Sequence, residues 1–199
     1  MITLPTGDLV GCIADVIPFA ELDDELPETN CVHLRWDGQF HAQATDTGKF
    51  AWSSWDPRDH VGDSWGGADE PWSVSISVAD AKALTKVFKL PKARMWQPLT
   101  VEHVGRSVRI KRDKVDELPA LTMVANETFL EFPDLQQRLA AHSTVDPMPG
   151  IAFNAADLAA FAKVRPYGPV EITFTGAKSL ALVHIGSRFT GGIWPAKAA

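Results

Sequence analysis

A stretch of acidic, histidine and tryptophan side chains between residues 52 and 72 contains the residue types of a metal site. Asp56, Asp59, His60 and Asp63 could supply carboxylate and imidazole ligands. Their spacing fits no calcium-loop pattern, and one histidine gives little support for a transition metal. We therefore expect an ordered surface loop with tryptophans packed beneath it, and we predict no metal site.

The other residues with reactive side chains predict no catalytic centre. Ser53 and Ser54 lack a Gly-x-Ser-x-Gly elbow, no glycine-rich phosphate loop occurs, and the six histidines are scattered. We predict a protein that is not an enzyme and uses no cofactor, with an enzyme built on the acidic residues 1–70 as an alternative. Cys12 and Cys31 each lie in an apolar run, so we expect buried free thiols.

Charge is segregated along the chain although the net charge is only −6. Residues 1–70 carry 14 acidic and 3 basic side chains, whereas residues 82–114 carry ten basic and two acidic ones. Lys82, Lys86 and Lys89 recur at helical spacing and form one stripe. The stripe is either a solvated helix face or a non-specific contact for duplex phosphates, to which four more residues are assigned: Lys92, Arg94, Lys163 and Arg165.

Length and composition indicate a globular protein of one or two domains. The chain has 199 residues, of which 45% are hydrophobic and 22% charged. No apolar run reaches the ~20 residues of a membrane helix, and the first residues do not resemble a signal peptide. We expect a cytoplasmic protein with no membrane partner.

The elements that must position these residues come from an internal repeat. Residues 73–77 alternate like a strand and lead into a helix with Ser77 as its cap and Asp80 in its first turn. The same pattern returns at Gly150–Asn154, where Asn154 and Asp157 take those places. A weaker copy precedes a helix near residues 6–17, which Pro18 should end or kink.

Each predicted helix is followed by three short strands separated by turn residues. After the first helix these are 31–36, 39–45 and 49–54; after the second, 99–104, 107–112 and 120–126; after the third, 170–175, 179–185 and 188–194. The sequence thus predicts an α+β fold of three strand–helix–three-strand units, with antiparallel sheets and helices on one face. We call residues 1–70 the first unit, 71–138 the second and 139–199 the third.

Three local motifs, in order along this repeat, resemble the bacterial DNA sliding clamp, the β subunit of DNA polymerase III. Ala44–Ala51 is similar to the family's Ala-Thr-Asp-x-x-Arg-Leu-Ala stretch, and Phe132–Leu135 to its Phe-Pro-Asp-Tyr. Gly192–Ala196 is similar to the Met-Pro segment near the family's C-terminus. The resemblance implies a clamp domain over 1–138, like the family's middle domain, and over 139–199 a half-domain like its last unit.

The resemblance also implies an apolar pocket that accepts a short peptide from a polymerase or another replication or repair protein. The family's pocket positions carry over to seven residues: Thr45, Phe50, Pro133, Arg138, Leu139, Trp194 and Pro195. For Phe50 and Trp194 plain core packing is the alternative. Clamp helices line a DNA channel, but the helix expected near residues 6–17 carries Asp8 and Asp15 and no basic residue.

The implied function is that of a ring-forming processivity factor in DNA replication, a homo-oligomer around double-stranded DNA. Clamps of this family close a ring from twelve units, so a chain of three units is expected to form a tetramer. The alternative is a clamp-derived interaction module that keeps the peptide pocket but does not encircle DNA.

Overall fold

The computed structural model describes most of the chain, with gaps among residues 1–199. The residues outside the described set are 22, 24–25, 27–28, 47, 61–64, 68–69, 113–120, 125–131, 136, 138–150, 165–168, 175, 177 and 197–199.

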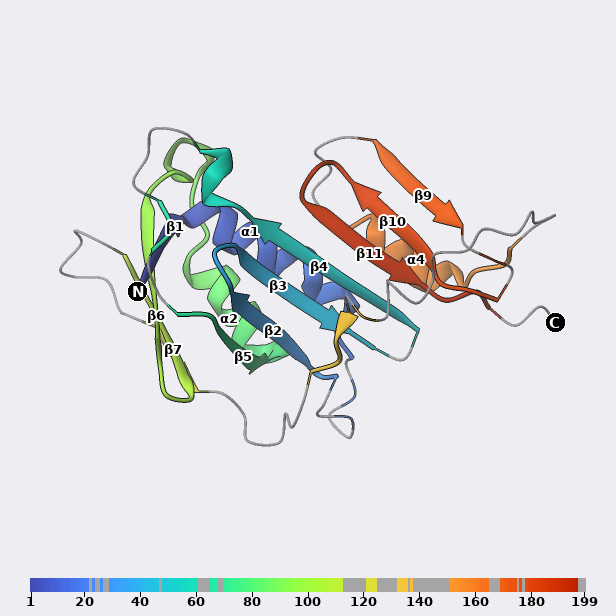
Figure 1. The fold of residues 1–199 in the computed structure, drawn as a ribbon, viewed down its shortest axis with the longest axis horizontal. Helices are drawn as coiled ribbons and strands as arrows, with labels where there is room; N and C mark the ends of the chain where they lie inside the picture. Colours follow the sequence, from blue (N-terminus) through green and yellow to red (C-terminus); the bar gives the residue numbers. More distant parts are fainter. Residues whose placement is uncertain are drawn as a thin grey trace.

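The first two units each contain one of the long α-helices, short 3-10 helices (η) and a set of antiparallel strands (Figure 1). The first unit contains β1 (Ile2–Pro5), α1 (Thr6–Val16), η1 (Ile17–Phe19), β2 (Cys31–Trp36), β3 (Phe40–Thr45), β4 (Lys49–Trp55) and η2 (Pro57–Asp59). The second contains β5 (Trp72–Ser77), α2 (Val78–Val87), η3 (Lys92–Arg94), β6 (Pro98–Val104), β7 (Ser107–Arg112) and β8 (Leu121–Val124).

The third unit contains α4 (Ala155–Phe161), β9 (Val170–Phe174), β10 (Ala181–Ile185) and β11 (Phe189–Ile193). One predicted element is missing: a strand was expected over Gly150–Asn154, yet the described residues 151–154 form no strand. A strand exists only through its hydrogen bonds to a neighbour, and in the described chain no second strand pairs with this segment.

Helix ends follow the local sequence. The Ser77 hydroxyl accepts the Asp80 amide at 3.0 Å, and the Asn154 side-chain oxygen accepts the Ala156 amide at 2.9 Å, so both predicted caps are confirmed. Helix α1 ends at Val16, and Pro18 lies in the short 3-10 helix that follows.

The described strands form two antiparallel sheets that join the units. One has the order β1-β6-β7-β8 and the other β5-β2-β3-β4-β11-β10-β9. In the larger sheet β4 of the first unit pairs with β11 of the third, with Phe50 opposite Gly192. The predicted α+β class is confirmed.

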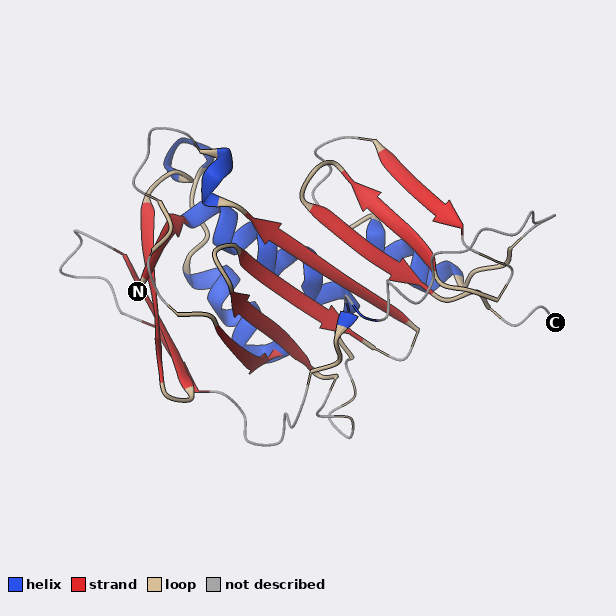
Figure 2. Ribbon diagram, viewed as in Figure 1, coloured by secondary structure: helices blue, strands red, loops and turns tan. Residues whose placement is uncertain are grey.

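Helices α1, α2 and α4 lie on one face of the larger sheet (Figure 2). Along β4, Ala51, Ser53 and Trp55 are buried on the helix face, with Ser53 touching Asp15 of α1. Phe50 and Trp52 therefore point to the opposite face, because successive side chains of a strand alternate. None of the described helices is long and apolar enough to cross a membrane.

Candidate functional site

The hairpin between β3 and β4 is held in one shape by its own side chains. The Thr45 hydroxyl contacts the carbonyl oxygen of Lys49 at 3.0 Å, and Thr45 is only 2% exposed. One Asp46 carboxylate oxygen accepts the amides of Gly48 and Lys49, each at 2.7 Å, while the Lys49 ammonium pairs with the other. Short side-chain bonds of this kind fix a turn.

Strand β11 lies against β4 and carries two glycines where rings approach. A Cβ on Gly192 would overlap Cε1 of Phe50, so the Phe50 ring occupies the space that a side chain would fill. Beyond the strand, the Trp194 amide donates to the Gly48 carbonyl at 3.0 Å. The hairpin of the first unit and the end of the third unit thus meet at Phe50 and Trp194.

A second apolar core lies at this meeting point, which we call the junction cluster. It consists of Phe50, Trp52, Phe132, Leu135, Leu180, Leu182 and Trp194. Phe50, Leu135 and Leu180 are at most 2% exposed, whereas Trp52, Phe132, Leu182 and Trp194 are half-buried. Large side chains that remain partly exposed around a buried centre are a common composition of binding surfaces.

The segment Phe132–Leu135 reaches the cluster from the second unit. The Phe132 ring stacks on the His33 ring at 4.6 Å between centroids and an interplanar angle of 3°. His33 Nδ1 is 2.9 Å from the Ser75 hydroxyl oxygen. Burial, with the Arg35 charge as a smaller cause, lowers the pKa of His33 to about 4. A neutral imidazole therefore supports the apolar ring at neutral pH.

The structure brings most of the predicted peptide-site residues together. Phe50 and Trp194 are members of the junction cluster; Pro133 follows Phe132, Pro195 follows Trp194, and both prolines are half-buried. Thr45 holds the hairpin that ends at Phe50. Arg138 and Leu139 lie outside the described residues.

The predicted peptide site lacked five members of this cluster: Trp52, Phe132, Leu135, Leu180 and Leu182. Ala181, Val183 and Ile185 of β10 are at most 3% exposed on the helix face, so Leu180 and Leu182 point to the other face with Phe50 and Trp52. The alternation of apolar residues on both faces of 179–185 was the available signal, since a strand with one solvated face has polar residues there.

A buried ion pair fixes the third unit to α1. Arg188, between β10 and β11, places Nη2 at 2.8 Å from Asp15 Oδ2 and Nη1 at 3.6 Å from Asp8 Oδ1. Asp15 is 1% exposed and also accepts the Ser53 hydroxyl at 3.4 Å. Burial, opposed by the charge of Arg188, raises the pKa of Asp8. The two acidic residues of α1 thus face a guanidinium of the third unit.

The predicted lysine stripe is exposed, but only Lys82 and Lys86 lie in α2, because the helix ends at Val87 and Lys89 follows it. Lys82, Lys86 and Lys89 are exposed, whereas Ala81 and Leu84 are 0% exposed and face the core. Lys92 and Arg94 of η3 and Lys163 after α4 are also exposed, while Arg165 lies outside the described residues. The helix face of the sheet therefore has a basic surface, and the junction cluster lies on the opposite face.

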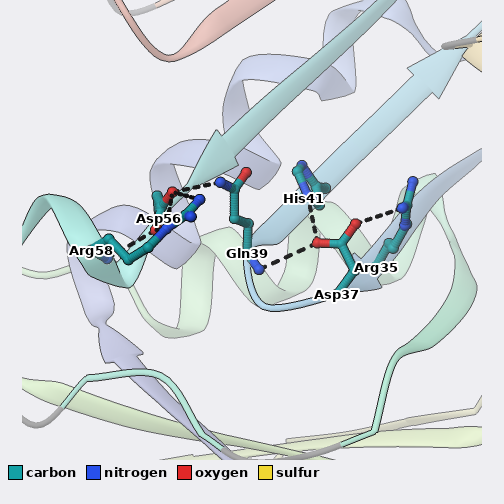
Figure 3. Close-up of polar contacts among 6 residues, drawn as sticks. All are labelled: Arg35, Asp37, Gln39, His41, Asp56 and Arg58. Atoms are coloured by element: carbon teal, nitrogen blue, oxygen red, sulfur yellow. Dashed lines mark hydrogen bonds and ion pairs between the residues drawn. The ribbon is translucent and has the colours of Figure 1, made fainter.

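The carboxylates near the β2–β3 turn are used within the protein (Figure 3). Asp56 accepts from Arg58 Nη2 at 2.6 Å and from Nε2 of the Gln39 side chain at 2.5 Å. Asp37 contacts Arg35 and His41, at 2.5 and 3.1 Å. Among the described residues no three potential ligands gather for a metal ion. The described part of 52–72 instead places Trp55 and Trp72 in the core, each at most 8% exposed.

Comparisons with known proteins give a result for structure but not for sequence. No protein-family model and no curated protein sequence matches the chain. Among solved structures, the DNA polymerase III β subunit of Thermotoga maritima matches with a TM-score of 0.75 and 16% identity, over 100% of this chain and 66% of that one.

Two further solved structures give similar values. The sliding clamp of Bacillus subtilis matches with a TM-score of 0.70 at 14% identity, over 100% of this chain and 64% of that one. The Pseudomonas aeruginosa sliding clamp bound to griselimycin matches with a TM-score of 0.73 at 12% identity, over 98% and 65%. The chain thus spans slightly less than two thirds of the length of these proteins, and it has the fold of the bacterial DNA polymerase III β sliding clamps.

Proposed function

We propose that this chain works as a DNA sliding clamp, a processivity factor that tethers a polymerase or another DNA enzyme. The observation that carries the proposal is the arrangement of two surfaces on opposite faces of one sheet. Exposed lysines lie on the helix face and the junction cluster lies on the other. A tether needs one surface for DNA and a separate one for the enzyme it holds.

The lysine stripe suits contact with the DNA backbone. Lys82 and Lys86 of α2, with Lys89 just beyond the end of that helix, present flexible point charges. Such charges neutralise phosphates without reading base edges, so the contact has no sequence preference and permits sliding.

The salt dependence of DNA binding tests this stripe. Each lost phosphate contact should reduce the slope of log affinity against log salt by roughly 0.9, so Lys82→Glu/Lys86→Glu/Lys89→Glu should abolish most of the binding. Lys178→Glu changes an exposed lysine outside α2 and serves as the control. Unchanged DNA binding by the triple variant would show that the stripe is only a solvated helix face.

The junction cluster suits an apolar peptide of the tethered enzyme. Trp52, Phe132, Leu182 and Trp194 are half-buried and surround a buried centre. Aromatic side chains in such a position contribute most of the binding energy of an interface. The rigid hairpin at Thr45 and Asp46 holds Phe50 in place before any ligand arrives.

Calorimetry with two probes tests this site: griselimycin, and a short peptide that contains leucine and phenylalanine. Loss of an aromatic anchor costs about 2 kcal/mol or more, so Trp194→Ala should weaken binding roughly thirtyfold. Phe50→Ala should do the same, with circular dichroism as a check of folding. Trp96→Ala removes a tryptophan that is 61% exposed outside the cluster and should leave binding unchanged. If the natural chain binds neither griselimycin nor the peptide, the site is rejected.

The second candidate is an interaction module that binds such peptides but does not encircle DNA. It is favoured by one observation: α1 carries no basic residue, so the basic surface of the helix face comes mainly from α2 and η3. Peptide binding without any salt-dependent DNA binding would establish this alternative.

A further inference from the structure

In the first and second units, one strand of each unit pairs with a strand of the other. Strand β1 of the first unit pairs with β6 of the second, and β5 of the second pairs with β2 of the first. Helices α1 and α2 pack together, and α2 also lies against β2. The strand that follows the helix, β2 or β6, is therefore paired along its edge with a strand of the other unit, and β2 also lies against the helix of the other unit.

From its helix onward the third unit has the same order of elements, but among the described residues no strand pairs with the outer edge of β9. β9 follows α4 as β2 follows α1 and β6 follows α2, and it stands at the end of the larger sheet among the described strands. Val170, Ile172 and Phe174 pair with the buried Ala181, Val183 and Ile185 and so point to the helix face. They are 55%, 44% and 42% exposed, whereas Val32, Leu34, Leu99 and Val101 of β2 and β6 are all 0% exposed.

Helix α4 shows the same difference at its fourth residue. Leu9 of α1 and Ala81 of α2 occupy that position and are 0% exposed, whereas Leu158 of α4 is 41% exposed. An apolar strand and an apolar helix position that are buried in two units are thus both open to solvent in the third.

The segment before α4 already lies in the place of β1. Thr3, two residues before the cap of α1, exchanges backbone hydrogen bonds with Gly66, at 2.9 and 2.7 Å. Ala152, two residues before the cap of α4, accepts the Ala196 amide at 2.8 Å. Gly66 and Ala196 both lie in the segment that follows the last strand of their unit, β4 and β11. In β1 the opposite edge pairs with β6, so the equivalent edge of 151–154 is the one that a further strand would use.

The missing complement cannot lie between the second and third units. Only residues 139–150 separate Arg138 from Ile151, whereas the first unit takes 70 residues. A second copy of this chain offers what each third unit lacks: a segment before a helix for the β9 edge, and a helix for the apolar face of β9.

We propose that two copies of the chain join their third units into one composite clamp domain. Segment 151–154 of each copy pairs with β9 of the other, and the two α4 helices pack as α1 packs on α2. The pairing of β1 with β6 places Leu4 opposite Leu99 and Thr3 opposite Thr100. The same register places Phe153 opposite Val170 and Ala152 opposite Glu171. Because the contact is reciprocal, it closes as a two-fold dimer and buries both edges.

The inference concerns how copies meet within the proposed clamp and thus rests partly on that function. Two three-unit chains joined this way contain six units in three domains, and two such dimers would supply twelve units. The dimer itself needs neither DNA nor peptide, so it can be tested apart from them.

A cysteine pair tests the register. Opposite residues on antiparallel strands have Cα atoms about 4.5–5.5 Å apart, a separation that a disulfide spans. Ala152 and Glu171 are both exposed, so Ala152→Cys/Glu171→Cys should not disturb folding, and mild oxidation should give a covalent dimer on a non-reducing gel. Each single cysteine variant is the control and should give little covalent dimer. The native Cys12 and Cys31 are buried.

Sedimentation of the 199-residue chain tests the apolar contact. Ile172→Lys should raise the dissociation constant of the dimer at least tenfold, whereas Val104→Lys, at a residue that is 67% exposed on β6, should leave it unchanged. A monomer at every concentration, or a dimer that the cysteine pair fails to link, would overturn the inference. If griselimycin still binds in that case, the peptide site stands. A chain that neither dimerises nor binds griselimycin would reject the dimer and the peptide site, each by its own measurement.

Discussion

The first two units and the third are built from the same pattern but reach different degrees of burial. In the first two units, helix and strand residues at equivalent positions are fully buried, as with Leu9 and Val101. In the third unit, Leu158 and Ile172 are each more than 40% exposed. This difference supports our proposal that the third unit is half of a domain whose apolar face a second unit covers.

The third unit is held by the first through contacts of a different kind. The β4–β11 ladder, the junction cluster and the ion pair of Arg188 with Asp15 join the two. These contacts lie at the opposite edge of the third unit from β9. One edge of the unit is thus fixed within the chain, while the other is available for a copy.

The largest expected effect on the unfolding free energy comes from breaking the ion pair of Arg188 with Asp15, which joins the third unit to the first. Arg188→Met leaves the carboxylate of Asp15, which is 1% exposed, without its guanidinium, and breaking a buried pair costs about 3–5 kcal/mol. Urea denaturation should show this loss of unfolding free energy. Arg58→Met is the control because the Arg58 side chain is 78% exposed, so its pair with Asp56 is screened by water and should contribute little to the unfolding free energy. Equal small effects for both variants would contradict this account of the junction.

The same helical position should respond differently in the two regions. Leu9→Ala removes a fully buried side chain and should cost about 2–5 kcal/mol of unfolding free energy. Leu158→Ala changes a residue that is 41% exposed and should stay within about 0.5 kcal/mol in dilute solution. Denaturation of both variants at low protein concentration measures the difference. A large loss for Leu158→Ala in a dilute monomer would mean that the third unit is already covered within one chain.

A smaller effect is expected from pH, through a histidine that links the paired units. His33 of β2 contacts Ser75 of β5, and its pKa falls from 6.5 to about 4 on folding. Between these values the unfolded chain binds a proton that the folded chain does not, so stability should fall by up to about 3 kcal/mol as pH drops from 6.5 to 4. Above pH 6.5 this contribution is fully present.

Denaturation of His33→Gln across this pH range should therefore show a weaker pH dependence than the natural chain. Ser75→Ala keeps the imidazole and should keep most of the slope, because burial is the larger cause of the pKa shift. An unchanged slope in His33→Gln would assign the pH dependence to other groups.

Local signals in the sequence predicted most elements but not their burial. Ser77 and Asn154 cap their helices as expected, because a cap depends on residues within one turn. The pair of Arg188 and Asp15 joins residues 173 positions apart, and no local pattern indicates it. The strand expected over Gly150–Asn154 depends on a partner that one chain does not supply within its described residues. Periodicity indicates which face is apolar; what covers that face is set by tertiary and quaternary contacts.

Binding to circular and linear DNA tests the proposed clamp most directly. The chain is mixed with nicked circular duplex, half of the sample is cut once with a restriction enzyme, and both are passed through a gel-filtration column at moderate salt. An encircling clamp elutes with the circle and is lost from the linear molecule, because it slides off the ends. Equal retention on both forms, or retention on neither while the peptide site still binds griselimycin, would contradict the claim that this chain encircles DNA.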